Sequence, residues 1–229
     1  AKQFIEDMSN DRNFFLSYLA QHRFNHTSFV IDEMIKLNRT ATSGFYQTIK
    51  EDAIGILGHS EGGVTVLGKI GAHPDKKFKD DRIKAALLFS APSYPFEKSL
   101  NSIAIPVMLM VGDNDTPAAH PELPRRLIYD EAKPPKFYLV LKDSTHFSFG
   151  NRVSDGLPLY QAVESVPQAN VICRYGLAFF EKYLKGNSSA DNQLGKTDST
   201  WVYYIKEEKK GASFEWGSEP APGESSSGG

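Results

Sequence analysis

The sequence predicts an α/β protein built on a mostly parallel sheet flanked by helices. Continuous apolar runs occur at α/β spacing, and such runs suit parallel strands that are covered on both faces. Each run ends in small or turn-forming residues, and these ends share the edge where parallel sheets bind ligands. A serine boxed between glycines follows the first run directly. The predicted strands cover residues 53–57, 83–89, 105–111 and 137–141.

Composition narrows the class of protein. The 229 residues are 40% hydrophobic and 24% charged, which is enough for one substantial core. The net charge is −2 and no basic stripe with interleaved aromatic residues occurs, so nucleic acid is not expected as a partner. No stretch approaches the roughly 18 apolar residues of a membrane helix. The lone Cys173 excludes an intrachain disulfide, and its apolar surroundings predict a buried, inert thiol.

The N-terminal region reads as helix and connector. Residues 1–26 carry scattered apolar clusters that suit loop and short helix. Thr27-Ser28 predicts an N-cap, with acidic residues in the following turns, so a helix is expected at about residues 28–38. Residues 39–51 are polar and connect this helix to the first strand. The sequence starts without methionine and shows neither a basic n-region nor an apolar h-region, so Ala1 is expected to be a processed or truncated start, with any targeting signal outside these residues.

Gly58-His59-Ser60-Glu61-Gly62 fits the pattern G-x-S-x-G. In this motif a buried strand ends in a turn so sharp that the serine backbone is strained, and the flanking glycines let the strand and the next helix pass closely. A helix should begin at once, with its first N–H groups facing any oxyanion that forms beside Ser60. The alternative is an ordinary surface turn.

Further elements follow in order. Residues 122–129 predict a crossover helix that starts near Pro124. Residues 171–185 predict a long helix that ends at Gly186. Residues 201–205 suit a short strand or a packing strip. From Gly211 onward small and polar residues dominate, so the chain divides into a domain at residues 1–210 and a disordered tail at residues 211–229.

An acid and a histidine follow the serine in the order that a catalytic triad needs. His146 comes just past a predicted strand, whereas His59 should pack under the turn, and the remaining histidines are expected on the surface (His22, His26, His73 and His120). Either Asp113 or Asp115 could orient His146, because both follow the strand at residues 105–111. Asp115 is favoured, and Asp113 could simply cap the turn.

The α/β-hydrolase fold is what the chain resembles in residues 58–63, 112–117, 144–147 and 179–186. Within that fold it resembles the dienelactone hydrolase-like group, which includes platelet-activating-factor acetylhydrolases and bacterial cutinase-like polyesterases. The resemblance covers about residues 23–186. It implies a serine esterase with Ser60, Asp115 and His146 as triad and the Glu61 N–H as one oxyanion donor. It implies no metal or organic cofactor, and it leans toward a secreted or periplasmic protein.

One departure from this family shapes the expectations. We call the sharp turn at residues 58–63 the elbow, and the strand that leads into it the elbow strand. The family places several strands before the elbow strand, and residues 1–52 do not have the pattern of those strands. Residues 1–210 are therefore expected to be a partial hydrolase domain. The strand at residues 53–57 would then be an exposed edge, open to self-association or to a second chain that completes the sheet. The alternatives to an esterase are a serine peptidase of the prolyl-oligopeptidase type and a catalytically silent fragment. An apolar acyl pocket would be lined by residues that follow strand ends (Pro92, Ser93, Tyr94, Phe147 and Phe149).

Overall fold

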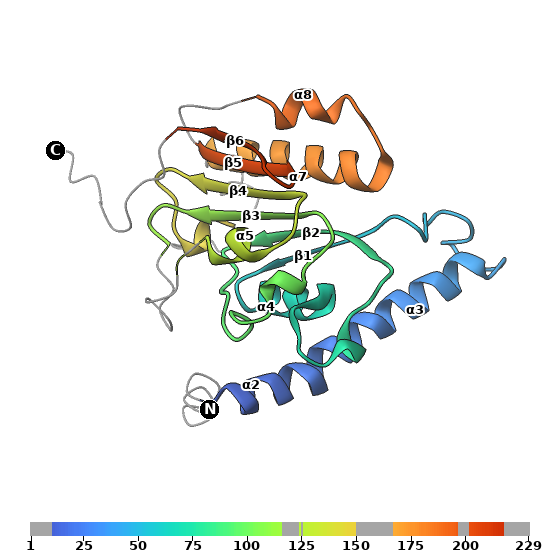
Figure 1. Cartoon of the computed structure of the whole chain (residues 1–229). Helices are drawn as coiled ribbons and strands as arrows, with labels where there is room; N and C mark the ends of the chain where they lie inside the picture. The colour runs from blue at the N-terminus through green and yellow to red at the C-terminus, as the bar shows by residue number, and fades with distance from the viewer. Residues whose placement is uncertain (1–10, 116–123, 125, 150–166, 197–201, 218–229) are drawn as a thin grey trace, which may run out of the picture.

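The computed structural model describes residues 11–115, 124, 126–149, 167–196 and 202–217. They form a six-stranded sheet in the order β1-β2-β3-β4-β5-β6, flanked by helices (Figure 1). The strands are β1 (Ile54–His59), β2 (Ile83–Phe89), β3 (Val107–Gly112), β4 (Lys136–Leu141), β5 (Val202–Lys209) and β6 (Ala212–Trp216). The architecture is therefore of the α/β type, and the strands predicted before residue 142 are confirmed.

The sheet is mixed, which corrects the prediction of a mostly parallel sheet. Strands β1 to β4 pair in parallel, but β5 runs antiparallel to β4, and β6 runs antiparallel to β5. Helix α8 (Ala190–Leu194) follows α7 (Pro167–Lys185) before the chain re-enters the sheet. Strand β5 then starts beside the carboxyl end of β4, where Leu141 pairs with Val202. The second half of β5 is polar, which an antiparallel strand tolerates and a parallel strand covered on both faces does not.

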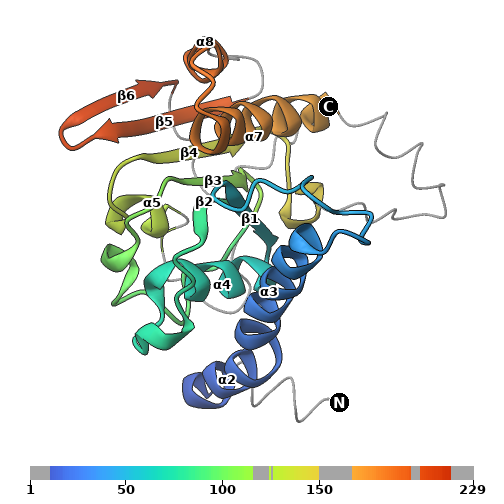
Figure 2. The ribbon, with the colours of Figure 1, turned by 90° about the vertical axis from the view of Figure 1, so that its right-hand side faces the viewer.

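Both faces of the sheet carry a hydrophobic core. In β3, Val107 and Leu109 pack on one side, and Met108 and Met110 pack on the other. Figure 2 shows α7 (Pro167–Lys185) and α8 on one side of the sheet, and α3 (Asn25–Arg39), α4 (Glu61–Leu67) and α5 (Leu127–Glu131) on the other. The alternation of buried side chains along the strands follows from the two-residue period of β structure. None of the described helices has the length and apolar character needed to cross a membrane.

Helical structure begins earlier than the sequence predicts. Helix α2 (Arg12–Leu19) is capped by Asp11, whose carboxylate accepts hydrogen bonds from the N–H groups of Asn13 and Phe14. A π-helical turn at Ala20–Phe24 joins α2 to α3. The predicted N-cap at Thr27-Ser28 is therefore wrong. Threonine and serine can also satisfy their hydroxyl groups inside a helix, and Thr27 Oγ1 donates to the carbonyl of Arg23.

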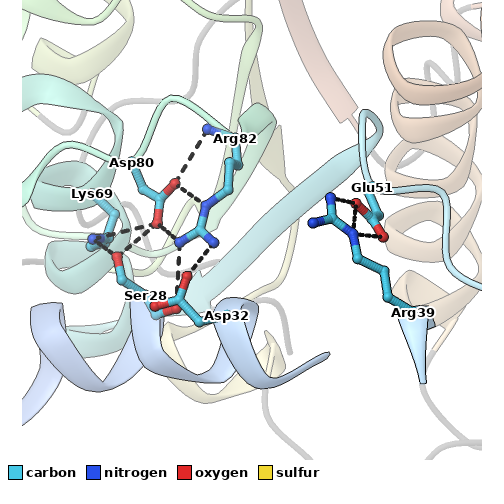
Figure 3. A network of polar contacts seen from close by, with 7 residues as sticks. All are labelled: Ser28, Asp32, Arg39, Glu51, Lys69, Asp80 and Arg82. Atoms are coloured by element: carbon cyan, nitrogen blue, oxygen red, sulfur yellow. Dashed lines mark hydrogen bonds and ion pairs between the residues drawn. The ribbon is translucent and has the colours of Figure 1, made fainter. Parts of the chain in front are cut away.

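A polar network with a buried centre ties α3 to the rest of the domain (Figure 3). The Lys69 ammonium donates to Ser28 Oγ at 2.5 Å, and Ser28 Oγ donates to Asp80 Oδ2 at 2.7 Å. Arg82 pairs with Asp80 and reaches Asp32 on α3. The side chains of Lys69 and Asp80 are only 3% and 6% exposed. The contact with Arg82 holds the pKa of Asp80 well below its usual range, so Asp80 stays ionised. The contacts of this network fix α3 against the π-helical turn Gly68–Ala72 that continues α4.

The chain after Gly211 is not uniformly a tail. Residues 212–216 form β6, so the prediction of disorder from Gly211 is wrong for this part, while residues 218–229 lie outside the described residues. Gly211 adopts φ +80° between β5 and β6. The Tyr204 and Phe214 rings contact at 6.2 Å, and the Tyr203 hydroxyl donates to Glu215 at 2.8 Å. These cross-strand pairs stabilise a strand that composition alone does not reveal.

Three other predictions concern surfaces. The prediction that His73 lies on the surface is wrong, because aromatic rings of the core pack around it and leave it 9% exposed. Cys173 is exposed on α7, which corrects the prediction of a buried thiol, because the core-facing side of this helix carries other residues such as Tyr175 and Phe179. Within the described part of the chain β1 has a single neighbour, β2, and therefore forms one edge of the sheet. Leu57 on this strand is 58% exposed, as expected for an open edge.

Candidate active site

The turn between β1 and α4 has the geometry that the G-x-S-x-G pattern predicts. Ser60 adopts φ 55° and ψ −124°, a conformation that L residues rarely occupy. A Cβ atom on Gly58 would lie 2.5 Å from the Gly62 backbone, and one on Gly63 would lie 2.3 Å from the Ala91 Cβ. Glycine is therefore required at both positions. A Cβ on Gly62 would have nothing within 4 Å, so the last glycine of the motif answers no steric need of its own.

Three strand ends bring Ser60, Asp115 and His146 together. Ser60 follows β1, Asp115 follows β3 and His146 follows β4, at the edge where parallel strands place their carboxyl ends. Ser60 Oγ lies 2.8 Å from His146 Nε2, and His146 Nδ1 lies 3.1 Å from Asp115 Oδ1. Because an ionised carboxylate can only accept, Nδ1–H donates to Asp115. This leaves Nε2 free to accept the proton of the Ser60 hydroxyl.

The electrostatics of the site suit a base near neutral pH. The Asp115 residue is buried, with 7% of its surface exposed. The hydrogen bond to Asp115 raises the pKa of His146 above its ordinary value of 6.5, and this effect outweighs partial burial, which acts in the opposite direction. Asp115 therefore does two things: it holds the imidazole in one orientation and it stabilises the imidazolium form.

Asp113 has a different place from Asp115. Its carboxylate accepts hydrogen bonds from the backbone N–H groups of Asp143 and Ser144, both at 3.0 Å. The Asn114 N–H donates to the Ser144 carbonyl at 2.9 Å. Asp113 thus clamps the loop after β3 to the loop after β4, which places Asp115 opposite His146. The sequence favoured Asp115 over Asp113, and in the structure it is the Asp115 carboxylate that lies on the histidine.

Glu61 is the first residue of α4, where a backbone N–H has no acceptor within the helix. Its role as an oxyanion donor stays a prediction. The Glu61 carboxylate lies 3.0 Å from the Arg23 guanidinium, and Arg23 belongs to the π-helical turn of the N-terminal helix. Sequence reasoning missed this pair, because a separation of 38 positions along the chain leaves no local signal.

The predicted acyl-pocket residues do not share one environment. Phe147 is 56% exposed, and its ring lies edge-to-face on His146 at 5.5 Å. Phe149 stacks on Phe89 at 5.5 Å, and Tyr94 stacks on Phe15 of α2 at 6.1 Å. Phe147 is thus placed beside the triad, whereas Phe149 and Tyr94 pack against the two cores. Of the neighbouring positions named from sequence, Ser93 is buried and Pro92 is partly buried.

A scan against models of known protein families finds no match for this chain, and no curated protein matches it either. Arguments about its activity therefore start from the site. Among the described residues, no three His, Cys, Asp or Glu side chains gather in a way that could hold a metal ion. The chemistry that the described side chains offer is that of a serine hydroxyl, an imidazole and a carboxylate in series.

Proposed function

We propose that this chain is a serine hydrolase of the α/β-hydrolase type that cleaves carboxylic esters through an acyl-enzyme. The observation that carries the proposal is the hydrogen-bond chain from Ser60 through His146 to Asp115. A serine hydroxyl is a weak nucleophile until an adjacent base takes its proton, and this chain supplies the base and the group that orients it. The strained backbone at Ser60 adds to the argument, because such conformations cluster at functional sites.

The reaction would proceed in two halves. Ser60 Oγ attacks the ester carbonyl while His146 Nε2 takes its proton, and the imidazolium then gives that proton to the departing alcohol. Water next attacks the acyl-serine with the same histidine as base, which releases the acid and restores Ser60. Asp115 stabilises the imidazolium in both halves. The N–H of Glu61 at the start of α4 would donate to the carbonyl oxygen as it gains negative charge.

The direct test is covalent labelling of the full chain with a fluorophosphonate probe, followed by mass mapping of the adduct. We expect a single adduct on Ser60. Hydrolysis of a short-chain nitrophenyl ester should accompany it, and Ser60→Ala should abolish labelling and lower kcat by about 10⁶. Ser43→Ala, in the loop after α3, is the matched control and should keep both.

Three results would contradict the proposal. An adduct on Ser93, Ser144 or Ser148 in place of Ser60 would move the nucleophile elsewhere. Faster turnover of a peptide anilide than of the nitrophenyl ester would indicate the peptidase of the prolyl-oligopeptidase type. A chain that is folded but neither labelled nor active would support the catalytically silent alternative.

A further inference from the structure

His59 is the last residue of β1 and the residue immediately before Ser60. Its Nε2 lies 2.8 Å from the backbone carbonyl of His146. A carbonyl oxygen can only accept, so His59 Nε2 carries a proton and donates it. The sequence predicts only packing under the turn for this histidine. In the structure, His59 instead joins the neighbour of the candidate nucleophile to the backbone of the candidate base.

Ring contacts support the same connection. The His59 and His146 rings lie 4.8 Å apart, and His59 also contacts Phe149 at 6.4 Å. Phe149 in turn stacks on Phe89, the last residue of β2. The partly buried imidazole of His59 therefore lies between the elbow and the short 3-10 turn His146–Phe149. Packing between these two segments limits the movement of the His59 ring.

Apart from the bond between His146 and Asp115, the other hydrogen bonds of this turn act over a short range. The Ser148 N–H donates to the Thr145 carbonyl, and the Thr145 N–H donates to Ser148 Oγ. These bonds shape the turn, but they do not fix its distance from Ser60. The bond from His59 does, because its donor is covalently next to Ser60 and its acceptor belongs to His146 itself. With the bond between Ser60 Oγ and His146 Nε2 it closes a small ring around the reacting atoms.

We propose that His59 is a positioning residue, which sets the distance between the Ser60 hydroxyl and the His146 imidazole. The proposal rests on the proposed hydrolase function. A displacement of about 1 Å between reacting groups can cost on the order of 10²-fold in rate. Without the His59 bond the turn would keep its local shape but shift relative to the elbow. Proton transfer would suffer, while substrate contacts elsewhere would remain.

The test compares two substitutions of His59. His59→Phe keeps the ring shape and removes the donor, whereas His59→Gln keeps an N–H donor of similar reach. We expect His59→Phe to lower kcat for a nitrophenyl ester by about 10–10² with KM nearly unchanged. His59→Gln should restore most of the loss. The control is His73→Phe, which alters a buried histidine with aromatic contacts away from the triad and should leave kcat unchanged.

An NMR titration of His146 in the same variants gives a readout that needs no turnover. His59→Phe should lower the pKa of His146, because a displaced ring loses part of its bond to Asp115, and His59→Gln should preserve that pKa. Equal His146 titration and equal kcat in all three proteins would overturn the positioning role, and so would equal impairment of both variants. A wild-type chain that hydrolyses no ester would count against the proposed function alone, since the titration decides the role of His59 separately.

Discussion

The elbow at residues 58–63 and the loops at residues 112–115 and 141–149 meet at Ser60, but different contacts hold them. The elbow depends on two residues that have no side chain. A Cβ on Gly58 would clash with the Gly62 backbone, and a Cβ on Gly63 would clash with Ala91. The loops depend on polar contacts, chiefly the Asp113 clamp and the bond between His146 and Asp115. The difference implies that steric changes should damage the elbow, whereas changes of charge or pH should damage the loops.

Among changes that keep Ser60, the largest expected effect is on the loop side. Asp115→Asn should lower kcat by about 10⁴, because the amide favours the wrong imidazole tautomer, as in a serine protease triad. Asp113→Asn should cost much less, since Asp113 does not contact His146 and the amide oxygen can still accept from one of the two backbone N–H groups of the next loop. Steady-state kinetics of both variants on one ester decides the ranking. A greater loss in Asp113→Asn would transfer the orienting role to that residue.

The next effect is on the elbow. Gly58→Ala places a Cβ against the Gly62 backbone, which cannot rotate away, so we expect a loss of about 1–3 kcal/mol in the free energy of unfolding. Gly62→Ala meets open space and lies early in α4, so it should be neutral or stabilising by up to about 1 kcal/mol. Denaturant unfolding measures both. If the two alanines prove equally harmful, the close approach at Gly58 is not what shapes the elbow.

The smallest expected effect is a pH dependence of activity and stability, which should arise in the loops and not in the elbow. Because Asp115 raises the pKa of His146, the acid limb of kcat/KM should have its midpoint above pH 6.5, and activity should fall below it as the imidazole becomes protonated. The stability that this histidine contributes to the folded state changes with pH in the opposite direction to activity. The raised pKa contributes folding stability that is complete below about pH 6.5 and is lost as pH rises through the folded-state value.

Asp115→Asn should remove this stability contribution and move the remaining acid limb to lower pH. Gly62→Ala serves as the control and should leave the limb in place. A wild-type midpoint at or below pH 6.5 would show that the bond to Asp115 does not govern His146 in solution.

Much of the architecture follows from local patterns. The strands up to Leu141 and the helix that ends at Lys185 were predicted because each is a continuous apolar run or a strong helical period. Predictions failed where the same residue type is compatible with two local structures. Ser28 has the chemistry of an N-cap but joins the network with Lys69 inside a helix, and the polar residues after Gly211 pair with β5 as β6.

The sequence by itself determined the elbow at Ser60, because the apolar run, the glycines and the start of α4 are contiguous and their backbone constraints act between neighbours. The sequence also identified the aspartates and the histidine that follow the predicted strands as candidates for the triad. Only the tertiary structure decided that Asp115 bonds His146 while Asp113 clamps the loops, that β5 runs antiparallel, and that His59 reaches the His146 carbonyl. These outcomes depend on distances between segments that are far apart in the chain. Packing across the sheet sets those distances, and local sequence patterns do not reveal that packing.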